Sequence, residues 1–449
     1  MKQPIKIVYN WIGPRGPIWN TEIPNVISLA ASQEGSKATS SFWWADDIWH
    51  KIFNAKSPQD AFKKHEPIFE LHPACLIDDR DVFIYPFSLA WRVNMRNYFL
   101  ADNGLLEFSH TQNHIIHQVR CGKGFFLIDL SAEAFVQDGQ LKAMHSYFSH
   151  LKIPMGKIIY LTGCMNADVI YEKFCQRHGI PNDVLQRMNI ISYPVSQQGF
   201  AQSLNSLPES HYATYDTEKV PEKLFLSWNR RFRRHRTTLA LAMEKWGLVD
   251  RSYVSMGLTD PESNMEKFEN TVDLFRDPAL EISSEDVTRF IKKLPLVLDG
   301  ETNIAQMCGD FNNATRQWYQ NSLVSIVTET NYDLQELTLT EKSFKPLKEK
   351  HPFIIVGVPG ALRAFRNLGF KTFGEFWNET YDEIEDPRLR MKEIVNTLRE
   401  IARWDENKIL DFKRKVNPIL HHNFELLKKD LSLTVAETIT NIIKSRYNL

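Results

Sequence analysis

Short apolar runs alternate with helical patterns through the first half of the chain. Apolar stretches at residues 6–12, 125–130, 157–162 and 189–194 have the length of buried strands. Between the last two runs, residues 168–178 show the spacing of an amphipathic helix and stop at a glycine. Alternation of this kind predicts βαβ units and a mostly parallel sheet.

A second series of strands and helices follows a polar stretch, residues 196–221, whose Ser, Asn, Pro and Glu residues are typical of a linker. The predicted strands of this series are residues 224–228, 323–328 and 353–357, and its first helix covers residues 237–246. Two α/β units of similar size are therefore expected. A cleft between them would lie at the carboxyl ends of the strands, where open parallel sheets bind ligands.

The fold class expected from this pattern is α/β, with two Rossmann-like domains facing a cleft and helices at the C-terminus. We predict an N-terminal α/β domain at residues 1–215 and a C-terminal α/β domain at 216–400. Residues 401–449 are predicted to be helices, and by analogy with known folds, not from periodicity, we expect them to pack back on the domains. Residues 13–20, which contain two Gly-Pro pairs, are expected to form a loop.

Composition narrows the class of protein. Among 449 residues, 43% are hydrophobic and 24% are charged, as in globular proteins, and the net charge of −1 gives no overall basic field for nucleic acid. The five cysteines are scattered and odd in number, which fits a reducing compartment. No apolar run approaches the roughly 20 residues of a membrane span. A cytoplasmic protein without a signal peptide or transmembrane segment is expected.

The densest cationic cluster of the chain lies where a predicted strand meets a predicted helix. After Asn229, six basic residues precede the helix expected at residue 237: Arg230, Arg231, Arg233, Arg234, His235 and Arg236. Helix N–H groups already favour an anion at such a turn. A bound diphosphate would relieve the repulsion among these cations, whereas the alternative interpretation is a solvated basic turn.

A second candidate segment follows the next predicted strand. Glu329 falls at the end of that strand, and Thr340 can cap a helix whose first turn holds Glu341 and Lys342. Lys345 shares a helix face with Glu341. A carboxylate at a helix start is well placed to bind a ribose diol, and a nearby lysine can reach a phosphate. An ordinary capped helix with a salt bridge is the alternative.

These segments together resemble a known family. Residues 227–236 and 340–346, with 352–360 and 368–373, resemble nucleotide-sugar glycosyltransferases of the GT-B type, nearest to bacterial and phage enzymes related to fucosyltransferases. The resemblance covers about residues 220–380. It implies two Rossmann-like domains, with a donor nucleotide bound by the C-terminal domain and an acceptor bound mainly by the N-terminal domain.

The resemblance also implies roles for single residues. Arg230 or Arg236 would meet the diphosphate, Glu341 would hold the ribose, and Lys342 or Lys345 would support the phosphates. The candidate donor-binding residues are Asn229, Arg230, Arg231, Arg236, Glu329, Thr340, Glu341, Lys342 and Lys345. No cofactor is expected beyond the nucleotide-diphosphate sugar, which is a co-substrate.

Sugar transfer from a diphosphate requires stabilisation of the leaving group's charge, by a metal ion or by fixed cations and helix dipoles. Because the arginine turn supplies cations, the sequence predicts a reaction independent of metal. An inverting transfer also needs a base for the acceptor hydroxyl. Asp46 and Asp47, which lie among three tryptophans, are the first candidates, and His114 is the next. An aromatic helix face with a solvated acidic pair is the alternative for Asp46 and Asp47.

Other interpretations remain open at this point. Asp79-Arg-Asp81 matches the metal-binding pair of single-domain GT-A glycosyltransferases, although an acidic turn also explains it. The expected function is sugar transfer to a surface glycan or a lipid-linked saccharide. One alternative is transfer to modified DNA bases, with nucleic acid as the acceptor. Another is a non-enzymatic nucleotide- or RNA-binding protein that uses the arginine turn, with Trp228 and Phe232 for stacking.

Overall fold

The computed structural model describes residues 5–9, 11–13, 16–18, 69–73, 76–88, 113–131, 134, 136–206, 215–229, 232–256, 278–298 and 316–447. The chain divides into two compact units. Unit 1 comprises Met1–Gly199 and Asp430–Leu449, and unit 2 comprises Phe200–Lys429. None of the described helices is both long enough and apolar enough to span a membrane.

Unit 1 is built on a six-stranded parallel sheet with the order β4-β1-β5-β6-β7-β8. Its strands are β1 (Ile5–Tyr9), β4 (Phe69–Pro73), β5 (Val82–Ser88), β6 (Lys123–Leu130), β7 (Ile158–Thr162) and β8 (Asn189–Ser192). The central strands β6 and β7 are almost wholly buried, which explains their continuous apolar sequences. The parallel sheet predicted from the alternating pattern is therefore confirmed.

The beginning of the chain differs from expectation. The apolar run at residues 6–12 forms two strands, β1 and β2 (Trp11–Gly13), and β2 pairs antiparallel with β3 (Gly16–Ile18). The loop predicted for residues 13–20 is wrong for this part. Gly13 lies opposite Gly16, so two residues connect the strands, which is the length of a tight hairpin.

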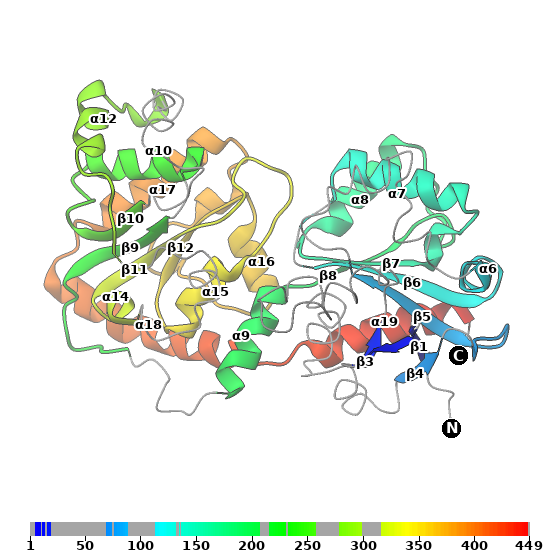
Figure 1. The fold of residues 1–449 in the computed structure, drawn as a ribbon. Coiled ribbons are helices and arrows are strands. Elements are labelled where there is room, and N and C mark those ends of the chain that lie inside the picture. Colours follow the sequence, from blue (N-terminus) through cyan, green and yellow to red (C-terminus); the bar gives the residue numbers. More distant parts are fainter. Residues whose placement is uncertain are drawn as a thin grey trace, which may run out of the picture. The chain divides into compact units, whose positions relative to one another are not determined.

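The two faces of the unit 1 sheet bury different helices. Side chains alternate along a strand, so Phe126 and Ile128 of β6 face one way while Phe125 and Leu127 face the other. The first face packs against α6 (Asn113–Cys121), α7 (Asp138–His150) and α8 (Ala167–Arg177). The second packs against α19 (Ser432–Tyr447), which comes from the far end of the chain and lies on the opposite side from α7 and α8 (Figure 1).

Unit 2 contains a four-stranded parallel sheet with the order β10-β9-β11-β12. Its strands are β9 (Lys223–Asn229), β10 (Ser252–Met256), β11 (Ser322–Thr328) and β12 (Phe353–Val356). Its helices are α10 (Arg234–Lys245), α12 (Ser284–Ile291), α14 (Arg316–Gln320), α15 (Glu341–Lys348), α16 (Ala361–Asn367), α17 (Pro387–Ile401) and α18 (Glu406–Leu427). Helices α10 and α17 cover one side of this sheet and α18 lies on the other (Figure 1).

The segment expected to be a linker contains a helix, α9 (Val195–Ser206). Three apolar side chains of α9, Phe200, Ala201 and Leu204, are buried. Their spacing of one, three and four residues places them on one helical face, so burial of that face outweighs the polar composition of the segment. The boundary between the two units, at Gly199 and Phe200, falls inside the predicted linker, but this part of the segment is helical.

The packing of α19 on the unit 1 sheet leads to a stability prediction. Ile439 is buried in that core, whereas Glu437 of the same helix is exposed. Ile439→Ala should lower the free energy of unfolding by about 2–5 kcal/mol, because it removes buried methyl groups and leaves a cavity. Glu437→Ala is the matched control and should change it by less than about 0.5 kcal/mol. Denaturant unfolding measures both, and equal small effects would contradict the packing.

Candidate functional site

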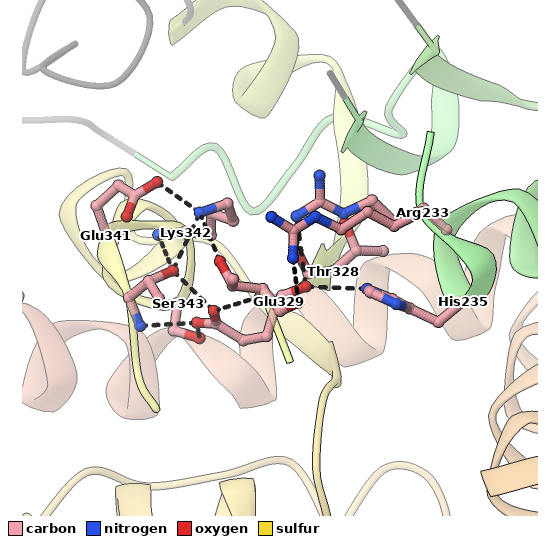
Figure 2. Close-up of polar contacts among 10 residues, drawn as sticks. Arg233, His235, Thr328, Glu329, Glu341, Lys342 and Ser343 are labelled. Atoms are coloured by element: carbon pink, nitrogen blue, oxygen red, sulfur yellow. Dashed lines mark hydrogen bonds and ion pairs between the residues drawn. The ribbon is translucent and has the colours of Figure 1, made fainter. Parts of the chain in front are cut away.

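Polar residues of four segments meet at the carboxyl edge of the unit 2 sheet. The segments are the end of β9, the first turn of α10, the end of β11 with the residues after it, and the start of α15. Figure 2 shows side chains from the last three of these segments linked by hydrogen bonds. The carboxyl ends of parallel strands are where such sheets bind ligands.

The carboxylate of Glu329 holds two of these segments together. It is buried, and Oε1 accepts hydrogen bonds from the Thr340 backbone N–H at 2.9 Å and from the Ser343 hydroxyl. Oε2 accepts from the Thr340 hydroxyl at 2.7 Å and from the Thr330 N–H at 3.0 Å. Four donors therefore surround one carboxylate. Glu329 therefore links the end of β11 to the start of α15 by hydrogen bonds (Figure 2).

Helix α15 begins where the sequence predicts. Thr340 has an extended backbone conformation at the N-cap, and its hydroxyl accepts a hydrogen bond from the Lys342 N–H. The same hydroxyl donates to Glu329, so it satisfies one helix N–H and one carboxylate oxygen at once. The predicted helix start at Thr340 is confirmed.

Asn229 links the end of β9 to the neighbouring strands by hydrogen bonds. Its Oδ1 accepts from the Thr328 hydroxyl at 2.7 Å, and its Nδ2 donates to the Ser227 hydroxyl at 2.9 Å. Its backbone N–H donates to the Ser255 hydroxyl at 3.1 Å. The side chain is buried and joins β9 to β11, so the structure places it as support for the edge.

The basic turn enters the helix earlier than expected. Helix α10 begins at Arg234, three residues before the predicted start at Thr237, because the Thr237 N–H already donates to the Arg233 carbonyl at 2.9 Å. Arg234 is exposed, whereas His235 and Arg236 are buried. The helical first turn therefore exposes Arg234 to solvent and buries Arg236, two residues further on.

Three successive backbone carbonyls, the last of β11 and the two that follow it, accept hydrogen bonds from the side chains of this turn. Arg236 Nη2 donates to the carbonyls of Thr328 at 3.3 Å and Glu329 at 3.4 Å, and Arg233 Nη1 donates to the carbonyl of Thr330 at 2.8 Å. These hydrogen bonds orient the guanidinium groups toward the end of β11 (Figure 2). They tie α10 to the same loop that Glu329 ties to α15.

His235 is a buried, neutral member of this network. Its Nε2 lies 2.9 Å from the Glu329 carbonyl, and its ring stacks on Tyr332 with 5.2 Å between centroids. Burial, followed by the positive charge of Arg236, lowers the pKa of His235 to about 3. A neutral imidazole with its proton on Nε2 fits the carbonyl acceptor.

Glu341 and Lys342 form the more accessible part of the edge. Their side chains are 30% and 31% exposed, and Lys342 Nζ lies 2.7 Å from Glu341 Oε1. Burial raises the pKa of Glu341, but the ammonium groups of Lys342 and Lys345 outweigh it, so the pKa lies below its ordinary value. Lys342 Nζ also lies within 3.4 Å of the Thr330 and Thr340 hydroxyls. The pair presents an ionised carboxylate beside a cation.

The arrangement suits an anionic ligand that also carries hydroxyl groups. The structure brings together seven of the nine predicted donor residues: Asn229, Arg236, Glu329, Thr340, Glu341, Lys342 and Lys345. Arg230, Arg231, Asp46 and Asp47 lie outside the described residues. His114 is exposed in the first turn of α6, in unit 1.

Sequence analysis did not select Arg233, Thr330, Ser343 or Tyr332 as members of this edge. Ser343 lies three residues after Thr340, which is one helical turn, so the capping pattern carried a signal for it. Arg233 was part of the basic turn without a distinct role. Tyr332 has no local signal, because its contact with His235 joins residues far apart in the chain.

The Asp-x-Asp segment of unit 1 has its own partners. Asp81 is buried, forms an ion pair with Lys6 at 2.6 Å and accepts from the Asp78 N–H at 2.9 Å. Asp79 accepts a hydrogen bond from the Gln118 side chain. These contacts favour the interpretation as an acidic turn. In the parts of the chain that the structure describes, no three His, Cys, Asp or Glu residues are grouped to hold a metal ion.

Comparison with known proteins gives few matches. No protein-family model matches the chain, and no curated protein matches it. Among solved structures, the fold is similar to that of alpha,alpha-trehalose 6-phosphate synthase from Burkholderia multivorans, with a TM-score of 0.43 and 11% sequence identity. The alignment covers 83% of this chain and 72% of that chain. A likeness of this degree carries no argument about activity.

The buried His235 predicts a pH dependence of stability. In the unfolded chain it protonates near pH 6.5, whereas in the folded chain its pKa is about 3. Its contribution to stability is therefore complete above pH 6.5 and is lost as the pH falls toward 3. His235→Gln keeps a side-chain N–H donor but cannot titrate. Between pH 6 and 4, its unfolding free energy should fall less steeply than that of wild type, by up to about 1.4 kcal/mol per pH unit.

Denaturant unfolding at several pH values measures this difference in slope. Exposed His421 is the matched control, and His421→Gln should keep the wild-type slope. Equal slopes for wild type and His235→Gln would contradict a buried, neutral His235.

Proposed function

We propose that the chain is a GT-B-type glycosyltransferase, and that the carboxyl edge of the unit 2 sheet binds its nucleotide-diphosphate sugar. The observation that supports this most is the ionised Glu341 beside Lys342, at the same edge as the guanidinium groups of Arg233 and Arg236. A donor of this class carries a diphosphate for the cations and a ribose diol for the carboxylate. The Thr340-Glu341-Lys342 segment is also part of the resemblance to fucosyltransferase-related enzymes.

The start of α10 adds to the attraction for a diphosphate. Its N-cap position holds Arg233 rather than one of the residues whose side chain accepts hydrogen bonds from helix N–H groups. A helix of 12 residues also carries partial positive charge at its N-terminus. Backbone N–H groups and fixed guanidinium groups then favour the same anion.

The chemistry follows from this placement. As the acceptor oxygen attacks the anomeric carbon, the bond from that carbon to the phosphate oxygen breaks, and its electron pair passes to the nucleoside diphosphate. Cations already fixed by the carbonyls of residues 328–330 would stabilise this charge with little reorganisation. On this basis we propose a transfer that uses neither a metal ion nor a cofactor.

The acceptor and the base belong to the same proposal. The acceptor would be a hydroxyl of a surface glycan or a lipid-linked saccharide. Asp46, Asp47 and, after them, His114 stay predictions for the base that removes its proton. A base is needed because an alcohol is a weak nucleophile while it keeps its proton.

A binding experiment tests the donor site. Calorimetry with UDP-, GDP-, CMP- and dTDP-sugars in EDTA should show that wild type binds at least one of them. Arg233→Met and Lys342→Met should each weaken that affinity by about 10- to 150-fold, the cost of losing a charge-assisted contact. Arg234→Met, an exposed arginine on the same turn, is the matched control and should bind like wild type.

The outcomes separate the candidate functions. Binding of no sugar nucleotide, or unchanged affinity in both variants, would overturn the proposed donor site. Binding that requires manganese would overturn metal independence. Salt-dependent retention of an RNA or DNA oligonucleotide, without binding of a sugar nucleotide, would instead favour a nucleic-acid-binding protein.

A second prediction concerns Glu341 as the residue that holds the ribose. Glu341→Gln keeps the size of the side chain but removes its charge. The variant should lose about tenfold or more in affinity for the nucleoside diphosphate, and less for its 2′-deoxy analogue, because the analogue lacks one hydroxyl of the diol. The same calorimetry with both ligands measures this, and equal losses would contradict the assignment.

A further inference from the structure

A buried arginine holds the loop that follows β11. Arg390, near the start of α17, is 1% exposed, and a guanidinium group keeps its positive charge in proteins. Its Nη1 donates hydrogen bonds to the carbonyls of Ile384 at 2.6 Å and Glu385 at 3.0 Å, and its Nη2 donates to the carbonyl of Tyr332. Within the ranges that the structure describes, no carboxylate forms an ion pair with it. Arg390 is therefore held by backbone carbonyls, which leave its formal charge in place.

The ring of Tyr332 contacts both Arg390 and His235. The guanidinium carbon of Arg390 lies 4.4 Å from the centre of this ring, which is a cation–π contact. The His235 ring stacks on Tyr332 with 5.2 Å between centroids and 14° between the ring planes. The Tyr332 hydroxyl donates to the carbonyl of Pro387 at 2.8 Å, at the first residue of α17. One aromatic ring thus connects α17 to the first turn of α10.

His235 belongs to the edge that is proposed to bind the donor. Its Nε2 lies 2.9 Å from the carbonyl of Glu329, beside the carbonyls that orient the guanidinium groups of Arg233 and Arg236. Burial lowers the pKa of this imidazole most, and the positive charges of Arg236, Arg233 and Arg390 lower it further, to about 3. The charge of Arg390 therefore acts on the same loop as the two guanidinium groups that are proposed to meet the diphosphate.

We propose that Arg390 is a positioning residue for the carboxyl edge of the unit 2 sheet, and that it acts through Tyr332 on His235. It is too deeply buried to touch a ligand. Its hydrogen bonds fix the backbone at Tyr332, and its contact with the ring fixes the stacking partner of His235. Without this support, the groups of the edge would have to be ordered when a ligand binds, and the cost of ordering them would weaken binding. That the ligand is a sugar nucleotide rests on the proposed function, whereas the placement of His235 does not.

NMR of the histidine ring protons tests the positioning without a ligand. The ring current of Tyr332 shifts the signals of an imidazole stacked on it, and the loss of signals in His235→Gln identifies those of His235. Arg390→Met removes the hydrogen bonds and the charge, so it should move these signals. Leu398→Ala, two turns further along α17 and also buried, is the matched control and should leave them in place. Unmoved His235 signals in Arg390→Met would overturn the proposal.

Calorimetry with the sugar nucleotide that wild type binds tests the effect on the edge. Arg390→Met should weaken the affinity by about tenfold or more, and Arg390→Lys, which keeps the charge, should weaken it less. Leu398→Ala should bind like wild type, although the cavity that it leaves makes the protein easier to unfold. Wild-type affinity in Arg390→Met, or an equal loss in Leu398→Ala, would show that Arg390 is merely structural. If wild type binds no sugar nucleotide, the proposed function fails, and the NMR comparison alone decides the role of Arg390.

The proposal stays testable if Arg390→Met does not fold. Arg390→Lys then replaces it in the NMR comparison and should also move the His235 signals, because an ammonium group lacks the planar fork of a guanidinium. Tyr332→Leu replaces it in calorimetry, since it removes the ring that links Arg390 to His235, and it should lose about tenfold or more in affinity. Tyr332→Phe keeps the ring and should bind like wild type. Equal affinities of the leucine and phenylalanine variants would contradict a role for the ring.

Discussion

The carboxylate of Glu329 is the constraint on which the edge of unit 2 depends. A buried charge is tolerated only when hydrogen bonds replace its hydration, and Glu329 obtains four of them from three residues: Thr330, Thr340 and Ser343. Two of those residues open α15, so satisfying the charge also fixes where the helix begins. The carbonyl of Glu329 accepts from His235 on the other side. One residue thus positions both helices that flank the site.

The residues at this edge fall into a buried group that is held by hydrogen bonds and a partly exposed group that can meet a ligand. The buried groups are held by hydrogen bonds within the fold, as for Arg236, which donates to the carbonyls of Thr328 and Glu329. Glu341 and Lys342 remain about a third exposed and carry the charges that meet a ligand. Bonds to backbone carbonyls orient a guanidinium group without cancelling its formal charge. Charges that are already oriented need little reorganisation when an anion arrives, which is the condition under which fixed cations contribute most to binding and transfer.

The two units use the same edge of a parallel sheet in different ways. In unit 2 the buried carboxylate is saturated by its own chain, and the ligand would meet cations at the surface. In unit 1 the buried carboxylate of Asp129 keeps one oxygen without a partner among the described residues. Four hydrogen bonds to one carboxylate make the unit 2 edge rigid.

The sequence by itself determined the local elements: the buried strands of the two sheets and the helix start at Thr340. The signal for each of these elements is local: the spacing of apolar residues within one segment, or a capping residue at its end. Only the tertiary structure decided that α19 covers one face of the unit 1 sheet and that His235 and Arg236 are buried. It also decided that the Glu329 carboxylate accepts four hydrogen bonds. These outcomes depend on contacts between residues roughly ten to several hundred positions apart. The spacing of polar and apolar residues does not reveal such contacts. A charged residue contributes to that spacing in the same way whether its side chain faces solvent or a distant carbonyl.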